Sequence, residues 1–245
     1  MRSIFPFQNE IMKKLLTILF SVLCLLNCSR SAFADVYKIN IDEFEEVNLR
    51  IPADVEWVDE DMASCVLQCS AENHKMIDIV MEGKVLVIKS KKKNWSSWNL
   101  KGGDKIYIRI TSSMLKKVKI NGSGDFKMKS SNGSSDFEYE INGSGDILAR
   151  VDAVNCKGTI NGSGDVLIAG KAGSFQLEIN GSGDVQAQDL VCESVTVEIA
   201  GSGDAKVNAT ESLVVKIAGS GDVQYKGNPK KLSQKVAGSG ELRKI

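Results

Sequence analysis

The residues best placed to do chemistry are acidic side chains that recur at a nearly constant spacing in the second half of the chain. Each ends a Gly-Ser-Gly-Asp motif, except the last, which ends Gly-Ser-Gly-Glu. They are Asp125, Asp146, Asp165, Asp184, Asp204, Asp222 and Glu241. Carboxylates on glycine-rich turns could bind calcium, but calcium takes about six to eight oxygen ligands, and only one turn in each repeat carries an acid. We therefore favour a row of Asx turns, in which Asp side chains accept hydrogen bonds from nearby backbone amides, and expect no metal or cofactor.

A second candidate site is a stretch rich in lysine and tryptophan that follows residue 89. Its candidate ligand contacts are Lys91, Lys92, Lys93, Trp95, Trp98 and Lys101. Aromatic rings beside lysines can stack on sugars or lie at an anionic lipid surface, so a ligand is first sought here. The alternative, which we favour, is a solvated loop whose tryptophans cover the open end of the fold.

The remaining reactive residue types do not have the spacing of a catalytic or metal site. His74 is the single histidine, and no partner stands at a motif spacing, so a surface or packing role is favoured over catalysis. Cys65 and Cys69 lie four residues apart in a strand-like run, about 13 Å at ~3.3 Å per residue, which is too far for a disulfide. Cys156 and Cys192 fall two repeats apart. We expect buried free thiols, and we assign no catalytic residue.

The repeat itself indicates which elements position the acidic column. Its structural turn residues are Gly122, Gly124, Asp125, Gly143, Gly145, Asp146, Gly162, Gly164, Asp165, Gly181, Gly183, Asp184, Gly201, Gly203, Asp204, Gly219, Gly221 and Asp222. Polar and apolar residues alternate on both sides of each turn, as in Phe137, Tyr139 and Ile141 before one and Ile147 and Ala149 after it. A period of two predicts strands with one buried face. The glycines on either side of the serine can take positive φ, and they leave no side chain to clash with neighbouring copies.

A single strand–turn–strand unit cannot bury its own apolar face, so the copies must stack at about 4.8 Å. The sequence therefore predicts an all-β, single-stranded, right-handed parallel β-helix (a β-solenoid) with two sheets and rungs of about 19 residues. Residues 118–245 form its regular part. Residues 35–117 lack the motif but alternate in the same way, and we expect irregular rungs and an N-terminal cap there. The asparagines before the first four turns, Asn121, Asn142, Asn161 and Asn180, predict an amide ladder.

Residues 1–34 have the pattern of a signal peptide. Lys13 and Lys14 precede an apolar core, and Ala32-Phe33-Ala34 forms an A-x-A cleavage site. We expect export to the periplasm or cell surface, and lipid anchoring at Cys28 is the less favoured alternative. The chain carries 31 basic and 31 acidic residues, and this zero net charge argues against nucleic acid as a partner.

The export signal, the strand-rich first half and the serial Ile-Asn-Gly-Ser-Gly-Asp and Ile-Ala-Gly-Ser-Gly-Asp units resemble the head GIN domain family of auto-transporter adhesins. The resemblance covers about residues 43–245. It implies a two-sheeted parallel β-helix related to pectin lyase folds, in which the Gly-Ser-Gly segment turns the chain between sheets. It also implies a role in adhesion, assembly as a trimer, and no catalytic residues.

We therefore expect a non-enzymatic exported β-helix protein with an adhesion or envelope-scaffold role. Its partner would be an unidentified protein or glycan, and the chain would form a homo-oligomer. The alternative function is a polysaccharide-acting enzyme on a lyase-like β-helix, which would need unique acidic and basic residues in one groove. Self-association through the strand at residues 242–245 is a third hypothesis.

Overall fold

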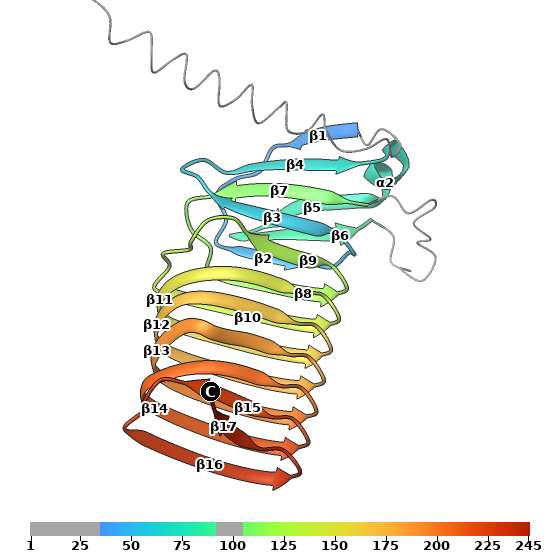
Figure 1. Ribbon diagram of the computed structural model, residues 1–245. Coiled ribbons are helices and arrows are strands. Elements are labelled where there is room, and N and C mark those ends of the chain that lie inside the picture. The colour runs from blue at the N-terminus through green and yellow to red at the C-terminus, as the bar shows by residue number, and fades with distance from the viewer. Residues whose placement is uncertain (1–34, 92–104) are drawn as a thin grey trace, which may run out of the picture. The chain divides into compact units, whose positions relative to one another are not determined.

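The computed structural model describes residues 35–91 and 105–245 (Figure 1). The expected signal peptide and most of the lysine- and tryptophan-rich stretch lie outside the described residues. The predicted ligand contacts that fall outside are Lys92, Lys93, Trp95, Trp98 and Lys101.

The Gly-Ser-Gly repeats form stacked parallel coils, as the sequence predicts. Their strands are β8 (Lys117–Gly122), β9 (Asp125–Met128), β10 (Asp136–Gly143), β11 (Ile147–Gly162), β12 (Val166–Gly181), β13 (Val185–Gly201), β14 (Ala205–Gly219), β15 (Val223–Lys226), β16 (Lys231–Gly238) and β17 (Leu242–Lys244). Neighbouring coils pair in parallel with equivalent residues opposite one another, so that Gly162 pairs with Gly181 and Gly181 with Gly201. This register confirms the predicted parallel β-solenoid.

Each coil contributes one strand to each of two sheets. The strand before the Gly-Ser-Gly corner belongs to what we call the first sheet, and the strand after it belongs to the second sheet. At the opposite corner, β11–β14 each bend within one continuous strand, with Gly170 of β12 at a φ of 121°, so the sheets merge into one 17-stranded hydrogen-bonded network in the described residues. In these four coils the chain therefore passes from the second sheet to the first through a bent strand.

The N-terminal part stacks in an order that differs from the order of the sequence. Its elements are β1 (Asp35–Ile39), β2 (Glu46–Leu49), β3 (Asp54–Asp59), β4 (Ser64–Cys69), α2 (Ala71–Met76), β5 (Ile77–Glu82), β6 (Val85–Ser90) and β7 (Tyr107–Ser112). The β2–β3 coil lies between β8–β9 on one side and β6–β7 on the other, with parallel pairing throughout. Strands β5 and β4 then pair antiparallel with β6 and β7, and β1 pairs antiparallel with β4. Antiparallel strands thus cover the parallel edges at this end of the stack.

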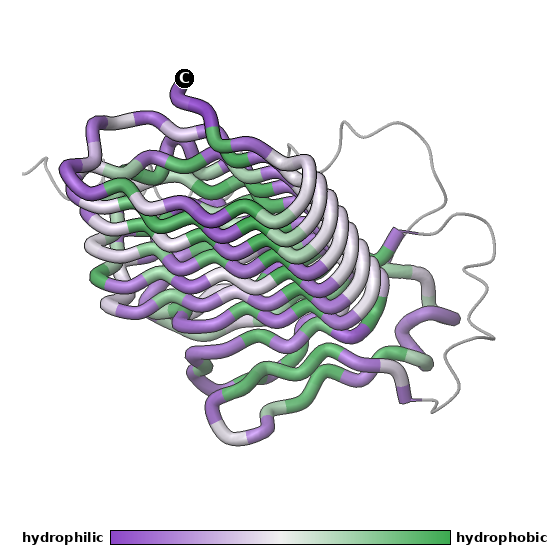
Figure 2. Tube along the Cα trace, turned by 90° about the horizontal axis from the view of Figure 1, so that it is seen from below, coloured by the Kyte–Doolittle hydropathy of each residue, from purple (hydrophilic) through white to green (hydrophobic). Residues whose placement is uncertain are grey.

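A continuous apolar core fills the space between the two sheets. It extends from Phe44 to Val223, and the inward residues Phe137, Tyr139 and Ile141 are no more than 1% exposed. Figure 2 shows the alternation of apolar and polar residues along each coil, and the pale glycine–serine corners stacked along one edge. Each coil buries the apolar side of its neighbours, so the repeated hydrophobic contact holds the stack together.

The two glycines of each corner are required for different reasons. Gly181 has a φ of 145°, which L side chains rarely adopt. Gly183 has no such φ, but a Cβ on it would lie 2.2 Å from the carbonyl oxygen of Gly164 in the preceding coil. The expectation that both glycines supply positive φ is therefore wrong for the second glycine, which is needed for close stacking.

The cysteines lead to a direct chemical prediction. Cys65, Cys69, Cys156 and Cys192 are buried thiols, and burial raises the pKa of Cys65 and of Cys192 to about 12. Because the thiolate is the reactive form, we expect the folded chain from Asp35 onward to react negligibly with DTNB at neutral pH. All these thiols should react once the chain is unfolded in guanidinium. Rapid labelling of any thiol in the folded protein, compared with free cysteine in the same buffer, would contradict their placement in the core.

Candidate binding groove

The acidic column bonds between coils instead of forming local turns. From Asp146 onward, the backbone amide of each acidic residue donates to the Oδ1 atom of the Asp in the preceding coil, as in Asp165 to Asp146 at 2.8 Å and Asp184 to Asp165 at 2.9 Å. The same bond recurs from Asp146 to Glu241. The prediction of Asx turns is therefore wrong in its geometry, because each carboxylate satisfies the amide of the next coil.

The carboxylates do not gather as ligands around a point. In the part of the chain that the structure describes, no three acidic, histidine or cysteine side chains converge as a metal site requires. They form a row with one acid per coil, and each Oδ1 atom from Asp125 to Asp222 accepts one backbone amide of the next coil. That no calcium binds stays a prediction.

The predicted amide ladder on the first sheet is confirmed. The Nδ2 atom of Asn142 donates to Asn121 at 3.1 Å, and Asn161 and Asn180 continue the series at 2.9 and 3.0 Å. The sequence reading missed Asn48 of β2, which accepts from Asn121 at 3.0 Å. Asn48 has no motif beside it, so only the stacking order brings it to the ladder.

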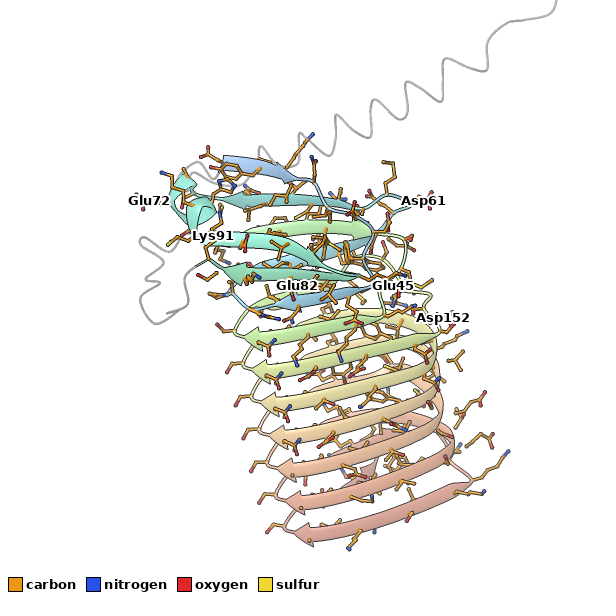
Figure 3. The ribbon with its side chains drawn as sticks, turned by 180° about the vertical axis from the view of Figure 1, so that it is seen from behind. Glu45, Asp61, Glu72, Glu82, Lys91 and Asp152 are labelled. Carbon is orange, nitrogen blue, oxygen red and sulfur yellow. The ribbon has the colours of Figure 1, made fainter. Side chains whose placement is uncertain are left out.

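Two other predicted positions lie in the N-terminal part. Lys91 directly follows β6, and its backbone amide donates to the Met76 carbonyl at 2.8 Å (Figure 3). It is the only described member of the predicted ligand loop, so that loop stays a prediction. His74 of α2 stacks on Tyr37 of β1, with ring centroids 3.6 Å apart. This contact agrees with the packing role that the sequence favours for His74.

A groove of about 580 Å³ runs across the outer side of the second sheet. One row along it is acidic, and it consists of Asp54, Asp125, Asp146, Asp165 and Asp184. A neighbouring row, two residues further along each strand, consists of Glu56, Lys127, Leu148, Leu167 and Gln186. The strands β3, β9, β11, β12 and β13 position both rows, because their parallel register places one member of each row in each coil.

The groove is acidic, with six carboxylates and one lysine, Lys127, among its lining residues. Within residues 35–91 and 105–245, no ion pair joins the five aspartates of this row to a lysine or arginine. Glu56 pairs with Lys129 at 3.1 Å. Burial, the hydrogen bond to Glu56 and the nearby acidic charges of Glu56 and Asp54 raise the pKa of Tyr107, at the end of the groove, to about 12. Because the five aspartates form no ion pair within these ranges, they present a row of negative charge to the solvent.

The sequence reading missed the apolar part of the groove, although a signal was present. Ile147 and Ala149 point inward, so Leu148 between them must point outward, and Leu167 lies opposite Leu148 in the next coil. Leu167 is 44% exposed. Two outward leucines at one repeat position break the alternation of polar and apolar residues, and that break indicates a contact surface.

The stacked coils, the glycine corners and the antiparallel cap allow a comparison with known proteins. The family model described as "Putative auto-transporter adhesin, head GIN domain" matches residues 43–229. The chain belongs to the head GIN domain family. This membership confirms the resemblance that the sequence shows, and the description of the family suggests that this head GIN domain protein is an exported or surface protein with an adhesin-like role.

Solved structures share the fold of this head GIN domain protein. A putative adhesin from Bacteroides fragilis NCTC 9343 has a TM-score of 0.79 at 23% identity, covering 88% of this chain and 98% of that one. A putative lipid binding protein from Parabacteroides distasonis ATCC 8503 has a TM-score of 0.70 at 24% identity, covering 88% and 98%. A putative adhesin from Parabacteroides merdae ATCC 43184 has a TM-score of 0.66 at 21% identity, covering 88% and 97%. At these identities the likeness shows the fold alone. A search of curated proteins gave no match.

Within the described ranges, no helix has the length and apolar character needed to span a bilayer. The enzymatic alternative gains no support from the comparisons, in which the family and the structural neighbours are named as adhesins or a lipid-binding protein. In the groove, the raised pKa of Tyr107 makes its phenol a poor general base at neutral pH.

Proposed function

We propose that this head GIN domain protein is a non-enzymatic, exported binding protein that acts in adhesion or as a scaffold in the cell envelope. The observation that carries the proposal is the groove of about 580 Å³ on the second sheet, where coils in register align a row of aspartates beside a row that contains two outward leucines. A rigid stack of this kind offers a long, preordered surface, which lowers the entropy cost of binding a partner. The family description and the adhesin names of the structural neighbours support the same role.

The same proposal covers the compartment and the assembly. The pattern of residues 1–34 supports export to the periplasm or the cell surface, in preference to anchoring through Cys28. The partner is a protein or a glycan, not nucleic acid, and neither a cofactor nor a metal takes part. Self-association, to a trimer by family resemblance, belongs to the proposal, and analytical ultracentrifugation of residues 35–245 checks it.

The test uses residues 35–245 immobilised on beads. We expect saturable capture of an envelope protein or an arrayed glycan, and loss of attachment or envelope integrity in a strain that lacks the gene. The matched enzymatic assay incubates the same protein with acidic polysaccharides and measures the release of unsaturated or reducing ends. Turnover in that assay, or unchanged attachment and envelope integrity after deletion, would overturn the proposal.

A further inference from the structure

We propose that the groove on the second sheet binds a basic amphipathic helix of a partner protein, which lies along the axis of the stack. The inference rests on the proposed binding function and names the chemistry of the partner. It follows from the two parallel rows of the groove, one of carboxylates and one with leucines at its centre.

The acidic row fixes the charge of the partner. Asp125, Asp146, Asp165 and Asp184 repeat at the coil spacing of about 4.8 Å. Each is exposed, and its Oδ1 atom is held by the amide of the next coil at 2.8–3.0 Å. Their orientation is thus set before binding, and no described lysine or arginine forms an ion pair with them. A cationic partner adds to the single lysine of the groove, Lys127, and gains this interaction without the entropy cost of ordering the carboxylates.

The second row requires the partner to carry apolar groups as well as cations. Leu148 and Leu167 stand opposite each other in neighbouring coils, beside Asp146 and Asp165. Outward side chains two residues apart along a strand are separated by about 6.6 Å. A ligand that covers both rows must therefore carry cations along one flank and apolar groups along the other. A polyamine or a purely basic coil meets the first requirement only.

An α-helix has the dimensions to meet both requirements. Its residues at i+3 and i+4 rise by about 4.5 and 6 Å, close to the coil spacing, and its diameter of about 10 Å spans both rows. Four intervals between coils cover about 19 Å, which corresponds to about 13 helical residues. Lysines or arginines on one flank and leucines on the next would then face the carboxylates and the leucines of the groove.

The test measures fluorescence anisotropy of a labelled leucine–lysine peptide of about 14 residues with helical i, i+3, i+4 spacing. The protein is residues 35–245. The charge variant is Asp146→Asn/Asp165→Asn/Asp184→Asn, which keeps each Oδ1 acceptor and removes the charge. The apolar variant is Leu148→Gln/Leu167→Gln. The matched controls are Asp204→Asn/Asp222→Asn, in the same column but beyond the groove, and Val191→Gln, an exposed valine elsewhere.

We expect the charge and apolar variants each to weaken peptide binding at least about tenfold, and the two controls to stay within about twofold. Affinity should fall as salt rises, and a peptide with glutamate in place of lysine should not bind. Unfolding curves that match the parent protein establish that each variant is folded. Equal weakening by the control variants, no effect of the leucine changes, or equal affinity for spermine would overturn the helix proposal.

This test separates the helix proposal from the broader function. Attachment that persists in the groove variants, together with absent peptide binding in the parent protein, would overturn the helix proposal and leave adhesion standing. Peptide binding that needs both rows, in a protein whose deletion changes neither attachment nor envelope integrity, would uphold the groove and overturn the adhesion role.

Discussion

Replacing Gly183 by alanine should destabilise the stack by about 3 kcal/mol or more. The new Cβ would lie 2.2 Å from the Gly164 carbonyl oxygen and 3.0 Å from a methyl group of Ile160. Both neighbours belong to the packed preceding coil, so the clash can be relieved only by separating coils that share core and hydrogen bonds. Urea unfolding followed by circular dichroism should show a lower midpoint with a similar slope.

Two other glycines supply matched controls. Gly133→Ala introduces a Cβ with no atom within 4 Å, so we expect no loss and a gain of up to about 1 kcal/mol from the stiffer unfolded chain. Gly122 has a φ of 132° but equally open surroundings, so alanine there isolates the backbone strain of about 1–2 kcal/mol. Equal effects at Gly183 and Gly133 would show that the corners are not stacked as closely as the structure has them.

A change at Gly158 should have a comparable effect for a different reason. Gly158 pairs with Tyr139, and a Cβ on it would lie 2.1 Å from the Cζ atom of that ring. Its equivalents in the next coils are Leu177 and Val197. Tyr139 is fully buried, so its ring occupies the volume that a side chain at residue 158 would fill. Gly158→Val should therefore cost about 3 kcal/mol or more.

The pair can be tested by a double-mutant cycle. Tyr139→Leu alone should cost about 2 kcal/mol by leaving a cavity, although it also removes a buried hydroxyl that has no hydrogen-bond partner. The double variant Tyr139→Leu/Gly158→Val restores the leucine and valine types of neighbouring coils. Its free energy of unfolding should exceed the additive value by about 2 kcal/mol or more. Additive effects would contradict the contact between the ring and the glycine.

The regular half of the fold can be predicted from the sequence because each repeat contains both the corner glycines and the alternating apolar residues that define its coil. Gly162, Gly181 and Gly201 mark equivalent corners, and the alternation around Phe137, Tyr139 and Ile141 identifies the buried side. Such local signals, repeated without large insertions, permit one register only, since a slip of one residue would turn every apolar side chain outward. The amide ladder follows in the same way, because the asparagines hold the same place in each repeat.

The first half and the groove could be predicted only in part. Strands near β2, β6 and β7 are visible as alternating segments, but local sequence does not say that the β2–β3 coil inserts between β6–β7 and β8–β9. That order depends on non-local packing. The prediction of Asx turns was wrong because the sequence of a single repeat does not show that a backbone amide of the next coil lies within hydrogen-bond distance of each carboxylate. The groove could not be predicted from a single strand, because it forms only where the two rows lie side by side. The alternation nevertheless places Leu148 and Leu167 on the outward side of their strands.

The stacking of equivalent corners is tested most directly by distances between spin labels. The corner serines Ser144, Ser163, Ser182, Ser202, Ser220 and Ser239 occupy successive coils, and the buried cysteines leave engineered ones as the reactive thiols. Cysteine labels at Ser144 and at Ser202, Ser220 or Ser239 should give distances near about 14, 19 and 24 Å, rising by about 4.8 Å per coil. Distances that alternate between short and long, or that do not rise steadily with coil number, would show that the corners lie at opposite ends and would contradict the solenoid.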